Sequence, residues 1–377
     1  MAASSSTQSP SPPRPFRLPA LSVSVPHVPG KGLVRLVRLL IILRSYAKEI
    51  LKGLWRYPLS DVLFGVRYGF AADRVHLYGR PGIKSGEYLS DLQRQFTRFI
   101  NAKAARELLE DKLLFAHLVG KLARVPENYL YFDRQRQVIV SDRWHELAAC
   151  RDPNRKYRLV MKPARGGGGV EISFPTLCSG VVTLAESSMT VDEFLQCASQ
   201  RNEYIVSEFI EQSAFFKKLH PGTTNTLRVI CMWDESGQPF IARAVLRLGS
   251  ARSGAVDSFG QGGLVAPFDV ATGVLAEAVD HDASSPRQPR FYAHHPDTGE
   301  AIAGEKVPGW AVARDESLRL MREMPFINYV GWDIVMSNDG PVFLEGNNYT
   351  GVRLAQSQEG LLRDVRVRQF YERFGII

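Results

Sequence analysis

Apolar residues follow helical spacing in the first third of the chain and alternate with polar residues in much of the remainder. Helical spacing runs through residues 31–57, KGLVRLVRLLIILRSYAKEILKGLWRY, and again through Asn101–Gly120. Short β-like runs follow at Tyr129–Phe132 and Gln137–Val140, and Gly360–Phe374 is the last predicted helix. Strands mixed with helices without strict β-α-β alternation predict an α+β fold.

A glycine run interrupts one strand pattern, in YRLVMKPARGGGGVEISF from Tyr157 to Phe174. The first strand leads to Lys162, and a second strand is predicted at Val170–Phe174. The glycines between them are Gly166, Gly167, Gly168 and Gly169. Their backbone N–H groups could close over phosphates, to which Lys162 adds a positive charge. No GK[ST] follows, so this is not a Walker loop. A mobile surface hairpin without a ligand fits the same pattern.

A second segment, YIVSEFIEQ, is a β-like run that ends in alternating acidic and apolar residues. Its last part contains Glu208, Phe209, Ile210 and Glu211. Such a strand edge could offer backbone groups to adenine and a carboxylate to ribose. By itself, the segment fits an ordinary strand that ends in solvated glutamates better.

The most informative segment is Tyr329–Asn348, YVGWDIVMSNDGPVFLEGNN, where a turn at Asn338–Gly340 separates two apolar runs. This pattern predicts a β-hairpin. If the loop consists of those three residues, Ser337 faces Pro341 and the pairing continues outward from there.

In that register Asp333 lies directly opposite Glu345, and Asn347 shares their face of the sheet. Directly opposed carboxylates, about 5 Å apart at Cβ, destabilise a hairpin unless something lies between them. Mg²⁺, which binds one or two carboxylates together with substrate phosphates, is the natural occupant. A one-residue shift of the turn would move Asp333 away from its position opposite Glu345. The alternative to a metal site is a pair of exposed acids at a sheet edge.

The charge of the chain is concentrated at its N-terminus. The sequence has 377 residues and a formal net charge of +8, and residues 1–60 hold nine basic residues and one acid. The rest of the chain is therefore neutral overall, which argues against a nucleic-acid-binding core. Residues 1–30 are rich in Ser and Pro and are predicted to be disordered. Their acid-poor composition also fits an organelle transit peptide.

Residues 31–57 form a basic amphipathic helix by their pattern. Their longest apolar run, Leu39–Leu43, is far shorter than the ~20 residues that a membrane span needs. The helix could lie on an anionic membrane surface, but packing against the body of the protein is favoured.

The four cysteines, Cys150, Cys178, Cys197 and Cys231, are widely spaced and form no CxxC pair. This spacing argues against a zinc cluster and against a disulfide scaffold. Free thiols in a reducing compartment are expected. A cytoplasmic location is expected from ATP use and from the absence of an export signal.

The order of these segments resembles the ATP-grasp superfamily over roughly residues 100–377. The matching residues are Lys112 (in EDKLLF), Lys162, the four glycines, Glu208 to Glu211, Asp333, Glu345 and Asn347. Within that superfamily, the chain is most similar to the sugar-transfer-associated, α-L-glutamate ligase-like group. The words that carry this similarity are NTLRVI, GGLVAPFDVATG and GWDIVMSNDGPVFLEGNN. Where this chain has Ser213 and Ser258, the group is expected to have His and Asn.

The resemblance implies a fold of two α+β subdomains that clasp ATP, preceded by a helical N-terminal region. The expected boundaries are 58–130 for the helical region, 131–210 for the first subdomain and 211–377 for the second. Lys112 and Lys162 would contact the α- and β-phosphates of ATP. In the hinge formed by Glu208 to Glu211, the backbone near Phe209 and Ile210 would hold adenine, and Glu211 would hold the ribose. Asp333, Glu345 and Asn347 would hold Mg²⁺.

The resemblance also places Arg228 and Arg247 beside the transferring phosphoryl group or a substrate carboxylate, although surface salt bridges fit them equally well. The implied activity is an ATP-dependent carboxylate–amine ligase that acts on small molecules through an acylphosphate, in surface-polysaccharide or sugar-conjugate synthesis. An ATP-grasp kinase for a sugar or alcohol, and a nucleotide-binding scaffold without turnover, are the alternatives.

Overall fold

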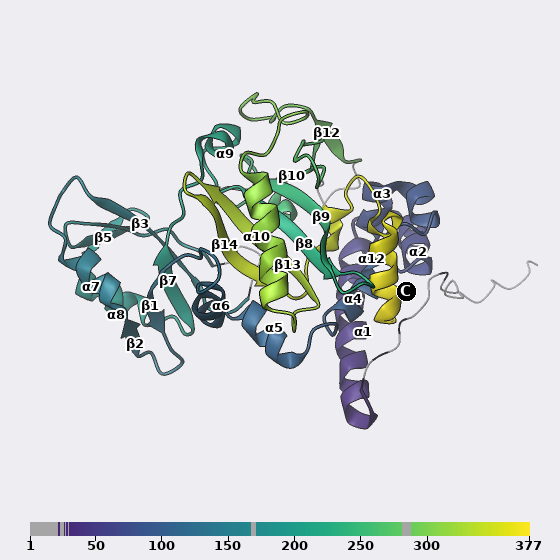
Figure 1. The fold of residues 1–377 in the computed structure, drawn as a ribbon, viewed down its shortest axis with the longest axis horizontal. Helices are drawn as coiled ribbons and strands as arrows, with labels where there is room; N and C mark the ends of the chain where they lie inside the picture. The colour runs from purple at the N-terminus through teal and green to yellow at the C-terminus, as the bar shows by residue number, and fades with distance from the viewer. Residues whose placement is uncertain (1–21, 23–25, 27, 29, 167–170, 281–287) are drawn as a thin grey trace, which may run out of the picture.

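Two seven-stranded antiparallel sheets form the framework of the molecule (Figure 1). The structure is a computed structural model that describes residues 22, 26, 28, 30–166, 171–280 and 288–377. Helices and strands are mixed as the pattern predicts, and the α+β architecture is confirmed. Most of the predicted N-terminal tail, together with Gly167, Gly168 and Gly169, lies outside the described residues.

The first sheet has the strand order β2-β1-β7-β3-β4-β5-β6. Its strands are β1 Asn128–Phe132, β2 Val138–Val140, β3 Lys156–Pro163, β4 Thr176–Cys178, β5 Val181–Leu184, β6 Ser187–Thr190 and β7 Tyr204–Glu208. Helices α7 (Asp142–Ala149) and α8 (Val191–Ala198) pack on one face through Trp144 and Phe194.

The second sheet has the strand order β12-β11-β10-β9-β8-β13-β14. Its strands are β8 Thr226–Trp233, β9 Pro239–Leu248, β10 Leu264–Pro267, β11 Ala278–Asp280, β12 Arg290–Tyr292, β13 Tyr329–Ser337 and β14 Gly340–Asn347. Side chains of β8 alternate between two apolar cores, with Leu227 and Val229 in one and Ile230 and Met232 in the other. Both faces of this sheet are therefore covered.

Helices from distant parts of the chain cover the two faces. One core includes α5 (Lys103–Glu110), α6 (Lys112–Val119) and α10 (Trp310–Glu323). The other includes α1 (Gly32–Leu54), α4 (Asp91–Thr97) and α12 (Val365–Arg373). The structure also contains the helices α2 (Leu59–Arg67), α3 (Ala72–Lys84), α9 (Ala214–Leu219) and α11 (Val352–Ala355), and the 3₁₀ turns η1 (Phe259–Gln261) and η2 (Leu361–Arg363). The N-terminal helices and the C-terminal helix thus belong to one core.

Two predicted helices are divided. The helix expected at Asn101–Gly120 breaks at Asp111, which is extended (φ −106°, ψ 111°) and caps α6 by accepting from the Leu113 and Leu114 N–H groups. Asp111 leaves the helical conformation because its side chain satisfies backbone donors of the next helix. Likewise, Asp364 caps α12 and separates it from η2, so the helix predicted at Gly360–Phe374 is two pieces.

The strand predicted at Val170–Phe174 was also wrong in extent. Val170 lies outside the described residues, and within Glu171–Phe174 pairing is limited to an isolated bridge between Ser173 and Met161. The hairpin itself is present, because β4 continues the pairing with β3.

Helix α1 confirms the predicted amphipathic helix, and it projects from the lower edge of the body in Figure 1. Across the described ranges, no helix combines the length and the apolar character that crossing a membrane requires. All four cysteines are free thiols, and Cys231 is buried in β8.

Candidate nucleotide-binding site

A cavity of about 720 Å³ lies where the two sheets and the N-terminal helices meet. Its lining includes nearly all the residues singled out in the sequence: Lys112, Lys162, Gly166, Glu208, Phe209, Ile210, Arg228, Arg247, Asp333, Glu345 and Asn347. Glu211 does not line it. Residues separated by more than 230 positions in the chain therefore face one space.

Two lysines from different elements face each other across the cavity. Lys162 comes from β3, and burial together with the nearby Lys112 charge lowers the pKa of Lys162 to about 8. Lys112 is the first residue of α6, so the break at Asp111 sets its direction. Its backbone N–H donates to the Ala164 carbonyl at 3.0 Å, and its Nζ donates to the Gly166 carbonyl at 2.6 Å. The Lys112 ammonium also lies 3.5 Å from the Glu345 carboxylate, so it connects the first sheet to the second.

The β13–β14 hairpin places Asp333 opposite Glu345, as predicted, but by a different route. The turn is shorter than expected, because Ser337 pairs with Gly340 rather than with Pro341. A regular ladder would then bring Leu344 opposite Asp333. A β-bulge shifts the register between Asp333 and Ile334 and restores the opposition to Glu345.

The bulge also explains how neighbouring residues of β14 enter the same cavity. Leu344 and Glu345 both line it, although consecutive strand residues ordinarily face opposite sides. Phe343 remains in the core on the other face of the sheet. The irregularity therefore brings Glu345 into the cavity without disturbing the packing of Phe343.

Asp333 is the centre of a buried ionic network. Its carboxylate accepts from Arg228 Nε, from Arg228 Nη2 at 2.9 Å and from Arg247 Nη1 at 3.0 Å. Arg247 also donates to Asp257 at 2.7 Å, and Arg228 donates to the Thr350 hydroxyl at 3.0 Å. Burial alone would raise the pKa of Asp333, but the two guanidinium groups outweigh it and hold the pKa below its ordinary value. Both arginines are therefore engaged with carboxylates rather than free.

Three of the hinge residues, Glu208, Phe209 and Ile210, line the cavity, and Glu211 does not. Glu208 holds Arg124 at 2.7 Å, and the Phe209 ring stacks under the Arg158 guanidinium, 3.8 Å from its carbon. Ile210 packs with apolar residues of the β13–β14 hairpin. Glu211 pairs with Arg158 at 2.9 Å outside the cavity, and its side chain is 55% exposed. Glu211, which was predicted to contact the ribose, therefore does not lie in the cavity with the other predicted residues.

The sequence of the chain was compared with protein families and with proteins of known function. A model of the family described as sugar-transfer associated ATP-grasp matches residues 91–369, well over half of the chain. The chain belongs to this family. The predicted resemblance and the ATP-grasp fold class are thereby confirmed. No curated protein matches this ATP-grasp chain.

Solved structures resemble this ATP-grasp chain only distantly. One is N5-carboxyaminoimidazole ribonucleotide synthetase in complex with ADP, at 12% identity and a TM-score of 0.35, covering 64% of this chain and 45% of that one. Another is VanG D-Ala:D-Ser ligase from Enterococcus faecalis, at 15% identity and a TM-score of 0.41, covering 77% and 69%. A third is L-amino acid ligase from Bacillus licheniformis, at 9% and 0.39, covering 81% and 54%. This chain thus spans about half the length of two of the three.

Mg²⁺ is the metal that the ATP-grasp fold implies, and the residues present fit it. Asp333 and Glu345 offer carboxylate oxygens side by side, and Asp333 is held ionised. The Asn347 amide nitrogen donates to the Gly331 carbonyl at 3.1 Å, which leaves its oxygen to accept. Hard oxygen donors of this kind suit Mg²⁺. Among the described residues no group of three His, Cys, Asp or Glu side chains forms a site, so the set depends on the amide and on ligand phosphates.

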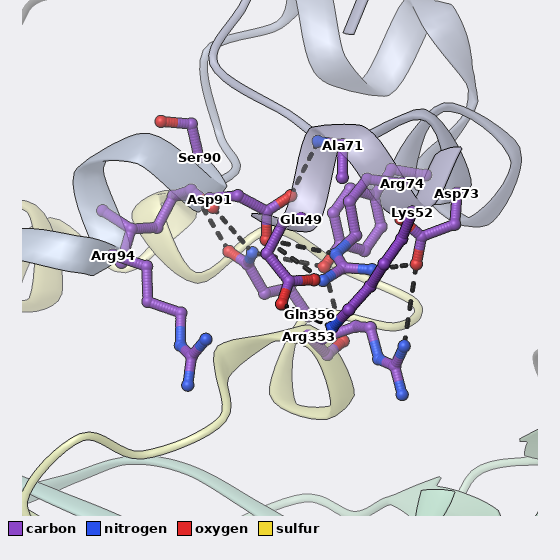
Figure 2. Close-up of polar contacts among 12 residues, drawn as sticks. Glu49, Lys52, Ala71, Asp73, Arg74, Ser90, Asp91, Arg94, Arg353 and Gln356 are labelled. Carbon is purple, nitrogen blue, oxygen red and sulfur yellow. Dashed lines mark hydrogen bonds and ion pairs between the residues drawn. The ribbon is translucent and has the colours of Figure 1, made fainter. Parts of the chain in front are cut away.

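Sequence reasoning missed the far end of this ATP-grasp cavity. There the lining comes from helices α1, α3, α4 and α11, with Asp73, Arg74, Asp91, Arg94 and Arg353 among the residues (Figure 2). Nothing in the local pattern around these residues distinguishes them from a solvated helix face. Only the packing of the N-terminal helices against α11 brings them together.

Proposed function

We propose that this protein is an ATP- and Mg²⁺-dependent ligase that joins a carboxylate to an amine through an acylphosphate. The observation that carries the proposal is the convergence of Lys112 and Lys162 on the opposed pair Asp333 and Glu345 in one cavity. Two cations for phosphate oxygens and two carboxylates for a cation are the parts that phosphoryl transfer from ATP requires.

The chain's own residues would bind and orient the nucleotide. Lys112, from α6, and Lys162, from β3, would hold the α- and β-phosphates. The segment Glu208–Ile210 would receive adenine. Asp333, Glu345 and Asn347 would hold Mg²⁺, which when bound supplies neutralisation of phosphate charge.

Arg228 and Arg247 would act in this site as positioning residues for Asp333. Their hydrogen bonds fix the carboxylate and keep it ionised, and Arg247 is in turn fixed by Asp257. Arg247 remains close enough to the carboxylate pair to stabilise charge that develops on a transferring phosphoryl group.

The reaction has two steps. An oxygen of the substrate carboxylate attacks the γ-phosphorus of ATP, the bond from that phosphorus to the β-bridging oxygen breaks, and ADP leaves. The amine nitrogen then attacks the acyl carbon, inorganic phosphate leaves with the electron pair, and the amine loses a proton to water. Positioning and charge neutralisation supply most of the rate enhancement in such transfers. The family description points to sugar acids, amino sugars and amino acids as the substrates to test.

The test is incubation of the purified protein with Mg-ATP and pooled acids and amines, followed by ³¹P NMR and mass spectrometry. Equal amounts of ADP, free phosphate and a new adduct lighter than its parts by one water are expected. ADP with a phosphorylated small molecule and no free phosphate would instead identify a kinase. Tight ATP binding without turnover across a broad panel would favour a scaffold and oppose the ligase.

A further inference from the structure

The far end of the cavity contains three arginines and two aspartates from separate elements: Arg74, Arg94, Arg353, Asp73 and Asp91. Arg74 is fully engaged. Its Nε and Nη2 each lie 3.2 Å from Asp91, and its Nη1 contacts Asp73. Asp91 also accepts from the Ala71 N–H at 2.9 Å. This part of the cluster joins α3 to α4 and has a structural role.

Arg353 differs from Arg74. Its Nη1 lies 3.6 Å from Asp73, and its guanidinium carbon lies 5.0 Å from the centre of the Phe259 ring. Within the described chain its side chain makes no hydrogen bond to another residue, although it is only 21% exposed. Burial and the neighbouring Arg74 charge lower the pKa of Arg353. A buried guanidinium with so few hydrogen bonds is costly, and an anion that accepted from it would stabilise the site.

Arg94 resembles Arg353 in its partners. Its guanidinium lies flat over the Tyr349 ring at 3.8 Å, and its Nε donates to the Thr350 carbonyl at 3.1 Å. In Figure 2 the Arg94 and Arg353 side chains both extend downward, away from Asp91, Arg94 at the left of the cluster and Arg353 at the right. Arg94 contacts a ring and backbone carbonyls, and Arg353 lies 3.6 Å from Asp73, so within the described residues neither guanidinium makes a close hydrogen-bonded pair with a carboxylate.

One short loop links this end of the cavity to the metal-binding end. Asp257 pairs with Arg247, and two residues later Phe259 lies under Arg353. Two residues span at most about 7 Å of backbone, and both Asp257 and Phe259 line the same cavity. Resting on the proposed function, we infer that the acid substrate carries a second anionic group, and that Arg353 with Arg94 binds this group while the reacting carboxylate faces the ATP phosphates.

Ligand-observed NMR on the full chain, saturated with Mg²⁺ and a non-hydrolysable ATP analogue, tests this inference. The probes are glutarate, 3-phosphonopropionate and butyrate. Glutarate or the phosphonate is expected to bind at least tenfold more tightly than butyrate, and the preferred one distinguishes a carboxylate from a phosphate as the second anion. Arg353→Met should remove that preference, and Arg353→Lys should restore part of it, since lysine keeps the charge but not the fork of donors.

The matched control is Arg322→Met, at an exposed arginine of α10 outside the cavity, and it should bind all probes as the wild type does. No preference for a dianion in the wild-type chain, or an unchanged preference in Arg353→Met, would overturn the inference. Dianion binding without ATP turnover would reject the ligase and leave the anion site standing. Turnover on monoacids would support the ligase and reject the second-anion site.

A second inference comes from an independent observation on α1. One side of this helix packs on the body through the buried Ile42, with Leu39 and Tyr46 beside it. The opposite side exposes large apolar side chains: Leu33, Val34, Leu36, Val37, Leu40, Ile41, Leu43, Leu51 and Leu54, with Trp55 just after the helix at 94% exposure. Leu33, Leu36, Val37 and Leu40 follow the i, i+3, i+4, i+7 spacing of one helix face. This face is contiguous from Leu33 to Leu43, before the exposed Arg44, and an apolar face of that size marks an interaction surface.

The charge around this face selects the occupant. Residues 31–56 contain seven basic residues, Lys31, Arg35, Arg38, Arg44, Lys48, Lys52 and Arg56, and one acid, Glu49. A basic helix with an exposed apolar side and a tryptophan at its end has the composition of helices that lie in the headgroup layer of an anionic membrane. We propose that α1 docks the protein on such a membrane surface.

Flotation of the full chain with vesicles tests this second proposal. Binding to vesicles of 70% phosphatidylcholine and 30% phosphatidylserine should exceed binding to pure phosphatidylcholine about tenfold or more and weaken with salt. The double variant Leu40→Glu/Ile41→Glu should abolish it, whereas Val365→Glu, at a residue 64% exposed in α12, should not. Equal binding by the double variant, no binding to either vesicle, or a wild-type dimer that the double variant dissociates would overturn it.

Discussion

At the residue scale, the carboxylates of the β13–β14 hairpin have different tasks although they lie opposite each other. Asp333 is 5% exposed and is enclosed by Arg228 and Arg247, whereas Glu345 faces the cavity with a side chain 21% exposed. Removing Asp333 should lower both stability and turnover, because it anchors the two arginines and is also a proposed metal ligand. Removing Glu345 should mainly lower turnover.

Glu345→Gln should lower the rate of ADP release by on the order of 10² or more while the protein remains folded, because a metal ligand is lost without a buried ion pair being broken. Steady-state ADP release and thermal unfolding measure the two effects. Asp339→Asn, in the exposed turn of the same hairpin, is the control and should leave both unchanged. Wild-type turnover in Glu345→Gln would contradict the metal assignment.

Asp333→Asn should instead lower the free energy of unfolding by about 3–5 kcal/mol, since it leaves Arg228 and Arg247 buried without their shared counter-ion. Urea unfolding measures this loss, with the same Asp339→Asn control. A stability equal to that of the wild type would show that the network is not held by charge.

Lys162 predicts how ATP binding depends on pH. Its pKa of about 8 in the free protein means that the ammonium form, which attracts phosphate, dominates below that pH. Bound phosphates would raise this pKa, so the affinity for Mg-ATP should be constant below pH 7 and fall by up to about tenfold per unit above pH 8. Calorimetric titrations between pH 6.5 and 9.5 measure the slope. Lys162→Arg should flatten it, because arginine stays charged over this range.

At the element scale, the sequence predicted the β13–β14 hairpin and helix α1, because each depends on a local pattern. The helices predicted at 101–120 and 360–374 were each divided by an aspartate that caps the next helix. The sequence could not predict the bulge at Leu344, because alternation in PVFLEGNN continues to read as a regular strand. The predicted opposition of Asp333 and Glu345 was right because a turn one residue too long compensated for a missing bulge. Arg353 was missed because its significance depends on a distant helix, α3.

The break between α5 and α6 gives an element-scale prediction. Asp111 caps α6 and also pairs at 2.9 Å with Arg165, the residue before Gly166. Asp111→Ala should cost about 1 kcal/mol for the lost cap and should also weaken Mg-ATP binding, because Lys112 follows directly. Urea unfolding and calorimetry separate the two effects. Asp142→Ala, in the first turn of α7 but not its capping residue, is the control.

At the scale of the whole molecule, the N-terminal helices are part of the same core as the second sheet. Leu92 and Phe96 of α4 pack with Phe370 and Tyr371 of α12. The family match begins only at residue 91, yet Ile42 of α1 belongs to that core. The core on this face of the second sheet therefore includes an element that precedes the matched region.

A close approach between the Glu87 backbone and Gly360 tests whether the N-terminal helices and the C-terminal part of the chain fold together. An added Cβ at Gly360 would lie 2.3 Å from the Glu87 carbonyl oxygen, which also accepts from the Leu362 N–H at 2.8 Å. Gly360→Ala should lower the free energy of unfolding by about 1–3 kcal/mol through this clash with backbone. Gly351→Ala, where the nearest atom is 3.8 Å away, should have little effect on urea unfolding. Two separate unfolding transitions would show that the N-terminal helices fold independently.

The contacts of Lys112 have a consequence for how the nucleotide enters. Its ammonium is already shared by the Gly166 carbonyl and the Glu345 carboxylate of the second sheet. On the proposed function, an arriving phosphate would take the place of both, so binding would be an exchange of partners rather than an addition to an unpartnered charge. The same exchange would detach Gly166 from α6, and the nucleotide would thereby replace the direct link that Lys112 makes between the two sheets.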